Sequence, residues 1–214
     1  MRTEELTLPG FQHDVCATVH PLAVSSPFFR SLPLARHGLE WIHPDACLAH
    51  PFDDGSVAML ERSVEATGAS LGADAAAWAD FVRPWTHDWY ALAADILRPL
   101  ERPRHPLRLA RFGLQALYSA ERLARRAFRE KRARALFAGN AAHAMVPLDR
   151  SPTAAFGLTL VVAAHAAGWP LARGGSRAIA AALAAHLREL GGEVQTGVRI
   201  ERLAEVEDAR TVLL

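Results

Sequence analysis

The amino-acid sequence predicts an α+β fold: a mostly helical cap beside an antiparallel or mixed sheet. Three observations lead to this prediction. Short strand-like runs dominate residues 1–60, helical periodicity dominates residues 61–170, and residues 171–214 combine one helix with one strand-like run. We therefore divide the chain into a β-rich part, a helical cap and an incomplete helix–strand unit at these boundaries.

Composition limits the class of protein. With 214 residues, the chain is long enough to bury a proper core as one domain or two small ones. Half of the residues are apolar and the net charge is +1, an ordinary globular composition that gives no reason to expect a nucleic-acid partner. Cys16 and Cys47 match no metal or redox spacing and no signal-peptide pattern is present, so we expect a cytoplasmic protein.

The first third of the chain carries the strand signals. Residues 2–14 contain strand-like pieces broken at Pro9-Gly10. Residues 38–60 follow as short strand-like runs, and Asp53-Asp54-Gly55 has the composition of a hairpin turn. Two such runs joined by Asp-Gly predict an antiparallel pair.

Three histidines in this region are candidate site residues. His20 suits acid–base chemistry near neutral pH, but a lone histidine beside Pro21 is more often structural; both interpretations stay open and the structural one is favoured. His43 and His50 lie seven residues apart without a cysteine or carboxylate cluster nearby. We therefore expect no metal site.

The middle of the chain is helical. Ala73–Arg98 has a recurring apolar face, and Pro84 predicts a kink in it. Its aromatic stripe lines either a core, the favoured interpretation, or a cavity for an apolar ligand. The stripe consists of Trp78, Phe81, Val82, Trp85, Trp89, Leu92 and Ile96.

Two further helices are predicted before residue 171. Leu107–Leu136 is helical and strongly basic, which is typical of a solvated face, although attraction to anionic lipid, nucleic acid or a nicotinamide-cofactor phosphate stays open. Ser151-Pro152 then begins a nearly all-apolar helix. The run Ala154–Trp169 is shorter than the roughly 20 residues of a membrane-spanning helix, so we expect a buried helix and no membrane span.

The last part of the chain reads as loop, helix, turn and strand. Ala178–Leu190 has helical spacing, Ser176 is a candidate cap, and Gly191-Gly192 supplies a left-handed stop. Glu193–Leu203 alternates as a strand with one apolar face. Gly174-Gly175 at the helix start allows close backbone approach to a ligand, where the helix dipole favours an anion.

These strings resemble a known family. Gly174–Leu183, Leu190–Val194 and Thr196–Ile200 are similar to the second flavin-contacting segment of FAD-dependent oxidoreductases related to phytoene desaturases, carotenoid isomerases and amine oxidases. Arg2–Glu5 and Gly10–Cys16 are similar to strings that follow the dinucleotide-binding unit of that family. The likeness continues along nearly the whole chain and includes the branch that resembles pyridine nucleotide-disulfide oxidoreductase domain-containing protein 2.

The resemblance implies a fold, a cofactor and a site. Residues 1–60 and 61–170 would belong to the substrate domain and its helical cap, and residues 171–214 to the FAD-binding layer. Gly174 and Gly175 would lie near FAD and the substrate cavity, and Ile200 would contact the adenine. The implied function is dehydrogenation or desaturation of an apolar small molecule, such as a polyene, by hydride transfer to flavin. No catalytic residue is assigned.

One expected motif is missing from the sequence. None of the fourteen glycines belongs to a G-x-G-x-x-G loop, which holds the pyrophosphate of a dinucleotide. The resemblance therefore implies an internal segment of a longer flavoprotein, also without the C-terminal flavin segment and inactive alone. The alternative is a non-catalytic α/β module that binds an apolar partner. In either case, exposed edges at Val194–Ile200 and Thr211–Leu214 would favour self-association.

Overall fold

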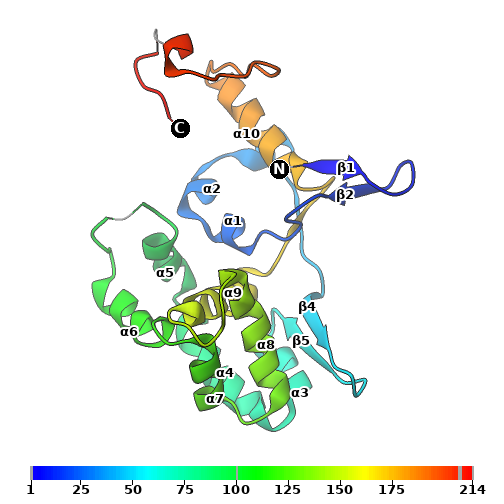
Figure 1. The fold of residues 1–214 in the computed structure, drawn as a ribbon, viewed down its shortest axis with the longest axis vertical. Helices are drawn as coiled ribbons and strands as arrows, with labels where there is room; N and C mark the ends of the chain where they lie inside the picture. The colour runs from blue at the N-terminus through cyan, green and yellow to red at the C-terminus, as the bar shows by residue number, and fades with distance from the viewer. Residues whose placement is uncertain (1, 100, 207–208, 214) are drawn as a thin grey trace.

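The computed structural model describes residues 2–99, 101–206 and 209–213, and in them the chain is α+β with far more helix than strand (Figure 1). The larger body is a group of helices. The N-terminal hairpin and the last long helix lie together at the opposite end of the molecule. The α+β prediction is confirmed at this level.

The strands form separate two-stranded antiparallel pairs, three in the described part of the chain, in place of one sheet. Two pairs are local hairpins. The β4–β5 hairpin turns at Asp53–Gly55, as the sequence predicts, whereas the sequence predicts strand-like pieces but no pairing for β1 and β2. The third joins strands from distant parts of the chain, which no local pattern reveals. The pairs are β1 (Thr3–Glu5) with β2 (Gln12–Asp14), β4 (Ala46–Pro51) with β5 (Val57–Glu61), and β3 (Trp41–Ile42) with β6 (Leu171–Ala172).

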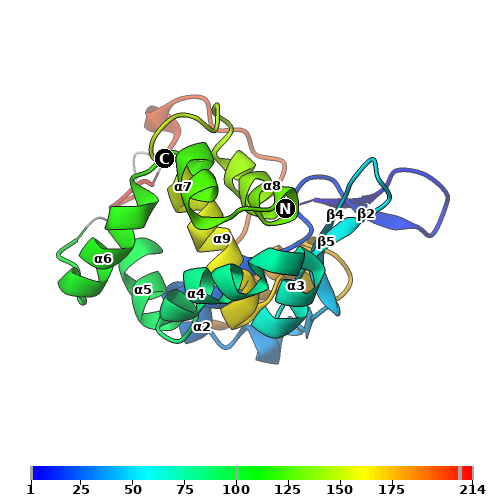
Figure 2. The ribbon, with the colours of Figure 1, turned by 90° about the horizontal axis from the view of Figure 1, so that it is seen from below.

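Helix α9 (Thr153–Ala167) is the centre of the helical body (Figure 2). Its almost entirely apolar sequence predicts burial on most sides, and most of its residues are buried. No helix in the described ranges is long and apolar enough to cross a membrane. The surrounding helices are α1 (Pro21–Ser25), α3 (Val64–Leu71), α4 (Ala75–Thr86), α5 (Trp89–Ile96), α6 (Pro106–Ala116), α7 (Ala120–Ala127) and α8 (Lys131–Ala141), with α2 (Pro27–Ser31) beside α1.

Two predicted helices are divided in the structure. The segment 73–98 becomes α4 and α5, with Pro84 in the last turn of α4, and the segment 107–136 becomes α6, α7 and α8. The break before α8 has a tertiary cause. The buried carboxylate of Asp74 accepts hydrogen bonds from the backbone N–H groups of Arg129 and Glu130, which fixes this turn outside a helix.

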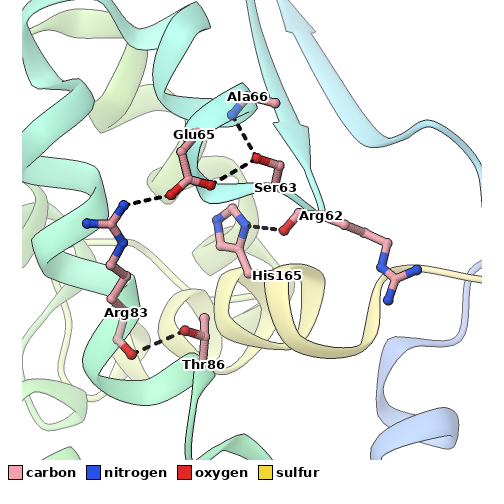
Figure 3. Close-up of polar contacts among 7 residues, drawn as sticks. All are labelled: Arg62, Ser63, Glu65, Ala66, Arg83, Thr86 and His165. Atoms are coloured by element: carbon pink, nitrogen blue, oxygen red, sulfur yellow. Dashed lines mark hydrogen bonds and ion pairs between the residues drawn. The ribbon is translucent and has the colours of Figure 1, made fainter.

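The aromatic stripe forms core, as the favoured interpretation expects. Trp78, Trp85 and Trp89 are buried, and the Trp78 ring stacks on Phe128 with 5.5 Å between ring centroids. On the same side of α9, the His165 ring reaches the carbonyl oxygen of Arg62 just after β5 (Figure 3). These contacts join β5, α4 and α9 in one hydrophobic core.

Helix α10 (Arg177–Glu189) ends as predicted but begins differently. Gly191 has φ +85°, and the N–H groups of Gly191 and Gly192 donate to the carbonyls of Arg188 and Leu187, a Schellman turn. Ser176 does not cap the helix with its side chain. Its hydroxyl donates to the carbonyl oxygen of Ala17 instead.

The prediction of a strand at Glu193–Leu203 is wrong. The segment is irregular up to a short 3₁₀ turn, Leu203–Val206, and Val194, Val198 and Ile200 are exposed. Alternation creates a strand only where a neighbour supplies hydrogen bonds, and no strand in the described residues pairs with this segment. Residues 211–213 of the second expected edge are also irregular, and Leu214 lies outside the described residues.

A second, smaller core lies under α10. Leu34, the first residue of the 3₁₀ turn η1 (Leu34–His37), and Leu39 just after this turn pack with Ala172, Ile179 and Ala182. This core joins residues from the N-terminal segment to α10. It places the start of α10 against the N-terminal hairpin.

Candidate functional site

The start of α10 meets the N-terminal hairpin through hydrogen bonds. Asp14 Oδ1 accepts from the backbone N–H of Ser176 at 2.7 Å and from the Thr3 hydroxyl at 2.7 Å. Thr3 Oγ1 in turn accepts from the N–H of Arg177 at 3.1 Å. Asp14 and Thr3, which lie more than 160 positions before α10 in the chain, thus cap the helix in place of the Ser176 side chain.

The two glycines before α10 have different surroundings. Both have positive φ, +78° at Gly174 and +89° at Gly175. A Cβ at Gly175 would lie 2.5 Å from Thr3 Cγ2 and 3.0 Å from Asp14 Oδ1, whereas a Cβ at Gly174 would meet no described atom within 4 Å. The glycine pair predicts that a ligand can approach the backbone closely here. At Gly175, the chain's own N-terminal hairpin lies this close to the backbone.

The negative charge expected at this helix start is supplied by Asp14. Burial raises the pKa of this carboxyl, but hydrogen bonds from the Thr3 hydroxyl and the Ser176 amide outweigh burial and hold the pKa below its ordinary value. An ionised carboxylate at a helix N-terminus is favoured by the helix dipole. Because Asp14 and Thr3 already use the N–H groups of Ser176 and Arg177, these residues fit a capped helix better than a phosphate cradle.

His20 is buried between the two segments. The Ser176 hydroxyl has one proton, which it donates to the Ala17 carbonyl, so at 2.9 Å it accepts from His20 Nε2–H. Burial lowers the pKa of His20 more than the nearby charge of Asp14 raises it. This geometry supports the structural interpretation, in which a neutral His20 ties residues 17–20 to α10.

An open groove runs along α9 from His20. Its first part, of about 640 Å3, lies between residues 16–23 and Trp169. Its second part, of about 400 Å3, lies between α5 and α9. The two parts share Leu22, His143 and Leu160, and we call them together the α9 groove.

The lining of the α9 groove is mostly apolar. Phe156 and Leu22 remain 46% and 38% exposed, although an ordinary core would cover them. The polar groups are few: Cys16, Thr18, His20, His143 and Thr159. An apolar hollow with a few polar groups is typical of a site for an apolar small molecule.

The structure does not bring Ile200 to Gly174 and Gly175. Ile200 lies in the irregular segment beyond the C-terminal end of α10, whereas the two glycines precede its first turn (Figure 1). The expected adenine contact therefore has no strand to carry it here.

Several cations of the basic segment make contacts within the chain. Arg125 pairs with Glu121 at 2.8 Å, Lys131 lies over the Phe52 ring, and Arg134 Nε donates to the Phe128 carbonyl. These cations are used in holding α7 and α8 in place.

One cluster was missed by the sequence analysis. His37, His186 and Glu189 place ligand atoms within 4.8 Å of one another. The available signal was the i, i+3 spacing of His186 and Glu189 on one predicted helix. His37 carries no local signal, because only the packing of η1 on α10 brings it there.

The chain was compared with protein-family models, with curated proteins and with solved structures, and it matches none of them. Its function is therefore argued from the residue strings and from the geometry above.

Proposed function

We propose that this chain forms the substrate-facing part of an FAD-dependent oxidoreductase that dehydrogenates or desaturates an apolar small molecule. The observation that carries the proposal is the position of the α9 groove. The groove begins at His20, which also bonds Ser176. The groove therefore opens beside the junction of Asp14–His20 with Gly174–Ser176. The resemblance places Asp14–His20 close to the flavin, and Gly174–Ser176 belongs to the segment that resembles a flavin-contacting string.

The described residues do not make an FAD site by themselves. The first N–H groups of α10 are used by Asp14 and Thr3, and Ile200 lies in an irregular segment. The sequence also has no G-x-G-x-x-G loop. The contribution that we assign to these residues is to bind and orient the substrate and to exclude water from it. In this proposal the chain alone does not retain FAD.

The groove also favours a second candidate, a non-catalytic module that binds an apolar partner. This candidate needs no flavin, and the self-capped start of α10 agrees with it. Translation of the upstream DNA in all frames separates the two. A G-x-G-x-x-G after a strand-like run supports the oxidoreductase, and its absence from every frame favours the module.

Binding of a fluorescent polyene fatty acid, cis-parinaric acid, tests the groove. Phe156→Asp places a charge in the groove, and the matched control Leu107→Asp changes a leucine that is 87% exposed on α6. Burial of a phenylalanine contributes about 1.5–3 kcal/mol, so Phe156→Asp should weaken binding roughly 10-fold or more. Equal affinities for the two variants would remove the groove as the site.

Flavin content tests the cofactor. The chain is expressed with excess FAD and desalted, and visible spectra are recorded for the protein and for its heat-released supernatant. We expect little or no flavin. A stoichiometric yellow protein would contradict our statement that the chain alone does not retain FAD.

A further inference from the structure

Two histidines and a carboxylate converge where η1 packs on the last turn of α10. His37 Nε2 lies 3.1 Å from Glu189 Oε2, and His186 Nδ1 lies 3.4 Å from the same oxygen. The side chains of both histidines are mostly buried, at 14% and 16% exposed, whereas that of Glu189 is 61% exposed. The cluster therefore has a buried nitrogen side and an open oxygen side.

Hydrogen bonds within the described residues do not satisfy the buried side chain of His37. Its Nε2 atom is buried and has no hydrogen-bond partner within the described residues, although a carboxylate oxygen lies only 3.1 Å away. The nitrogen is thus close to the oxygen but not directed at it as a donor. A buried nitrogen without a partner costs free energy, and a bound cation would remove that cost.

We propose that His37, His186 and Glu189 bind a divalent transition-metal ion of the zinc class. A tetrahedral zinc ion with bonds of about 2.0–2.1 Å sets neighbouring ligand atoms roughly 3.3–3.4 Å apart. The two measured distances, 3.1 and 3.4 Å, are close to this edge length. Two imidazoles and one carboxylate form a known donor set for zinc, whereas calcium and magnesium prefer oxygen ligands only.

The surrounding fold holds these ligands in place before a metal binds. His186 and Glu189 lie at i and i+3 on α10, so they share one face of the helix. His37 is the last residue of η1, which the smaller core fixes against α10 through Leu34 and Ile179. A bound metal ion would link α10 to η1 through these three ligands. With three protein ligands, the fourth position lies on the open Glu189 side and takes water or a small ligand.

Metal titration of the full chain tests the site. Zn2+ is titrated calorimetrically in chelator-free buffer, and Co2+ is used as the spectroscopic probe. We expect one equivalent of metal and a tetrahedral Co2+ absorption that Zn2+ displaces. His37→Ala, His186→Ala and Glu189→Gln should each weaken metal binding by more than about 10-fold. Even mutations of residues that only hydrogen-bond to metal ligands lower metal affinity about 10- to 100-fold. The matched control, exposed His87→Ala, should bind like the unchanged chain.

Three outcomes would overturn the proposal. They are no saturable binding by the unchanged chain, an equal loss of affinity in His87→Ala, or retained binding in the His37→Ala/His186→Ala double variant. Glu189 is exposed, so Glu189→Gln should keep the fold, which circular dichroism checks. The test is independent of flavin and of the α9 groove.

Discussion

His165 is a buried histidine whose charge state follows from its two hydrogen-bond partners. Trp78 Nε1 can only donate, and it lies 3.0 Å from His165 Nε2, so Nε2 is an acceptor. The Arg62 carbonyl, 3.2 Å from Nδ1, can only accept, so Nδ1 carries the proton (Figure 3). A second proton would set two N–H groups against each other. Burial accordingly lowers the pKa of His165, outweighing hydrogen bonds and charges that raise it.

Acid should therefore destabilise the fold. The pKa of His165 is lowered in the folded state, so the unfolded chain binds the proton first as pH falls below the ordinary value of 6.5. The stabilising contribution of neutral His165 is present above that pH and is lost as pH falls through the folded pKa. His20 and His43 also have lowered pKa values and add to the effect.

Urea denaturation from neutral pH to about pH 5 measures this dependence. The free energy of unfolding should fall over this range, and less steeply in His165→Gln, which has no ring to protonate. The same pH slope in both proteins would contradict the assignment of His165. A residual slope in the variant is expected, because His20 and His43 remain.

Gly174 and Gly175 provide a matched pair at the candidate site. Either residue changed to alanine should cost about 1–2 kcal/mol for its left-handed backbone. Gly175→Ala should cost roughly 1–3 kcal/mol more, because its Cβ would overlap Thr3. Equal losses of unfolding free energy in chemical denaturation would mean that the hairpin moves aside freely.

At the scale of elements, the packing of α9 against α8 depends on Gly157 of α9. A Cβ there would lie 2.8 Å from Phe137 Cε2 and 3.1 Å from Ala141 Cβ, both on α8. Gly157→Ala should therefore destabilise by about 1–3 kcal/mol despite the better helix propensity of alanine. Gly113→Ala in α6 meets no described atom within 4 Å, and it should stabilise by roughly 0.5–1 kcal/mol. Thermal and urea melts of the two variants should shift in opposite directions; a gain in both would contradict close packing.

The elements that the sequence predicts well are those set by local pattern. The apolar run of α9 and the glycine stop of α10 lie in the sequence itself, and both helices appear within one or two residues of expectation. The β4–β5 hairpin has its turn residues beside it. The break between α7 and α8 was not predictable, because its cause, Asp74, lies 55 positions away.

In the candidate site, too, local pattern predicts some features, whereas contacts between distant parts of the chain determine the others. Gly174-Gly175 is visible as a glycine pair, but the reason for Gly175 is contact with Thr3 and Asp14, which no local pattern indicates. His37 reaches α10 only through the smaller core. The failed strand Glu193–Leu203 is the converse case: its alternation is correct, but backbone pairing depends on a neighbour that the pattern does not contain.

At the scale of the whole molecule, residues 34–39 and 172–182 share one core, and residues 58–169 form another. Leu34 and Leu39 pack with Ile179 and Ala182, whereas the larger core is built mainly around α9. The pairing of β3 with β6 connects the two. The start of the α9 groove lies beside this connection, because Trp169, one of its lining residues, lies two residues before the start of β6.

The segment after α10 should make the chain self-associate. It exposes an alternating apolar face at Val194, Val198 and Ile200, together with backbone groups that no described strand pairs. A second copy supplies what is missing, since two such segments can pair their backbones and cover both apolar faces. Sedimentation velocity over a range of concentrations should show association that Val198→Asp/Ile200→Asp suppresses and that Leu107→Asp, which adds one charge on α6, leaves unchanged. Because irregular backbone in one copy becomes strand in the pair, circular dichroism should gain β signal with concentration. If the chain stays a monodisperse monomer at every concentration and its β signal does not rise, then the exposed alternating apolar side chains of this segment are not sufficient for self-association.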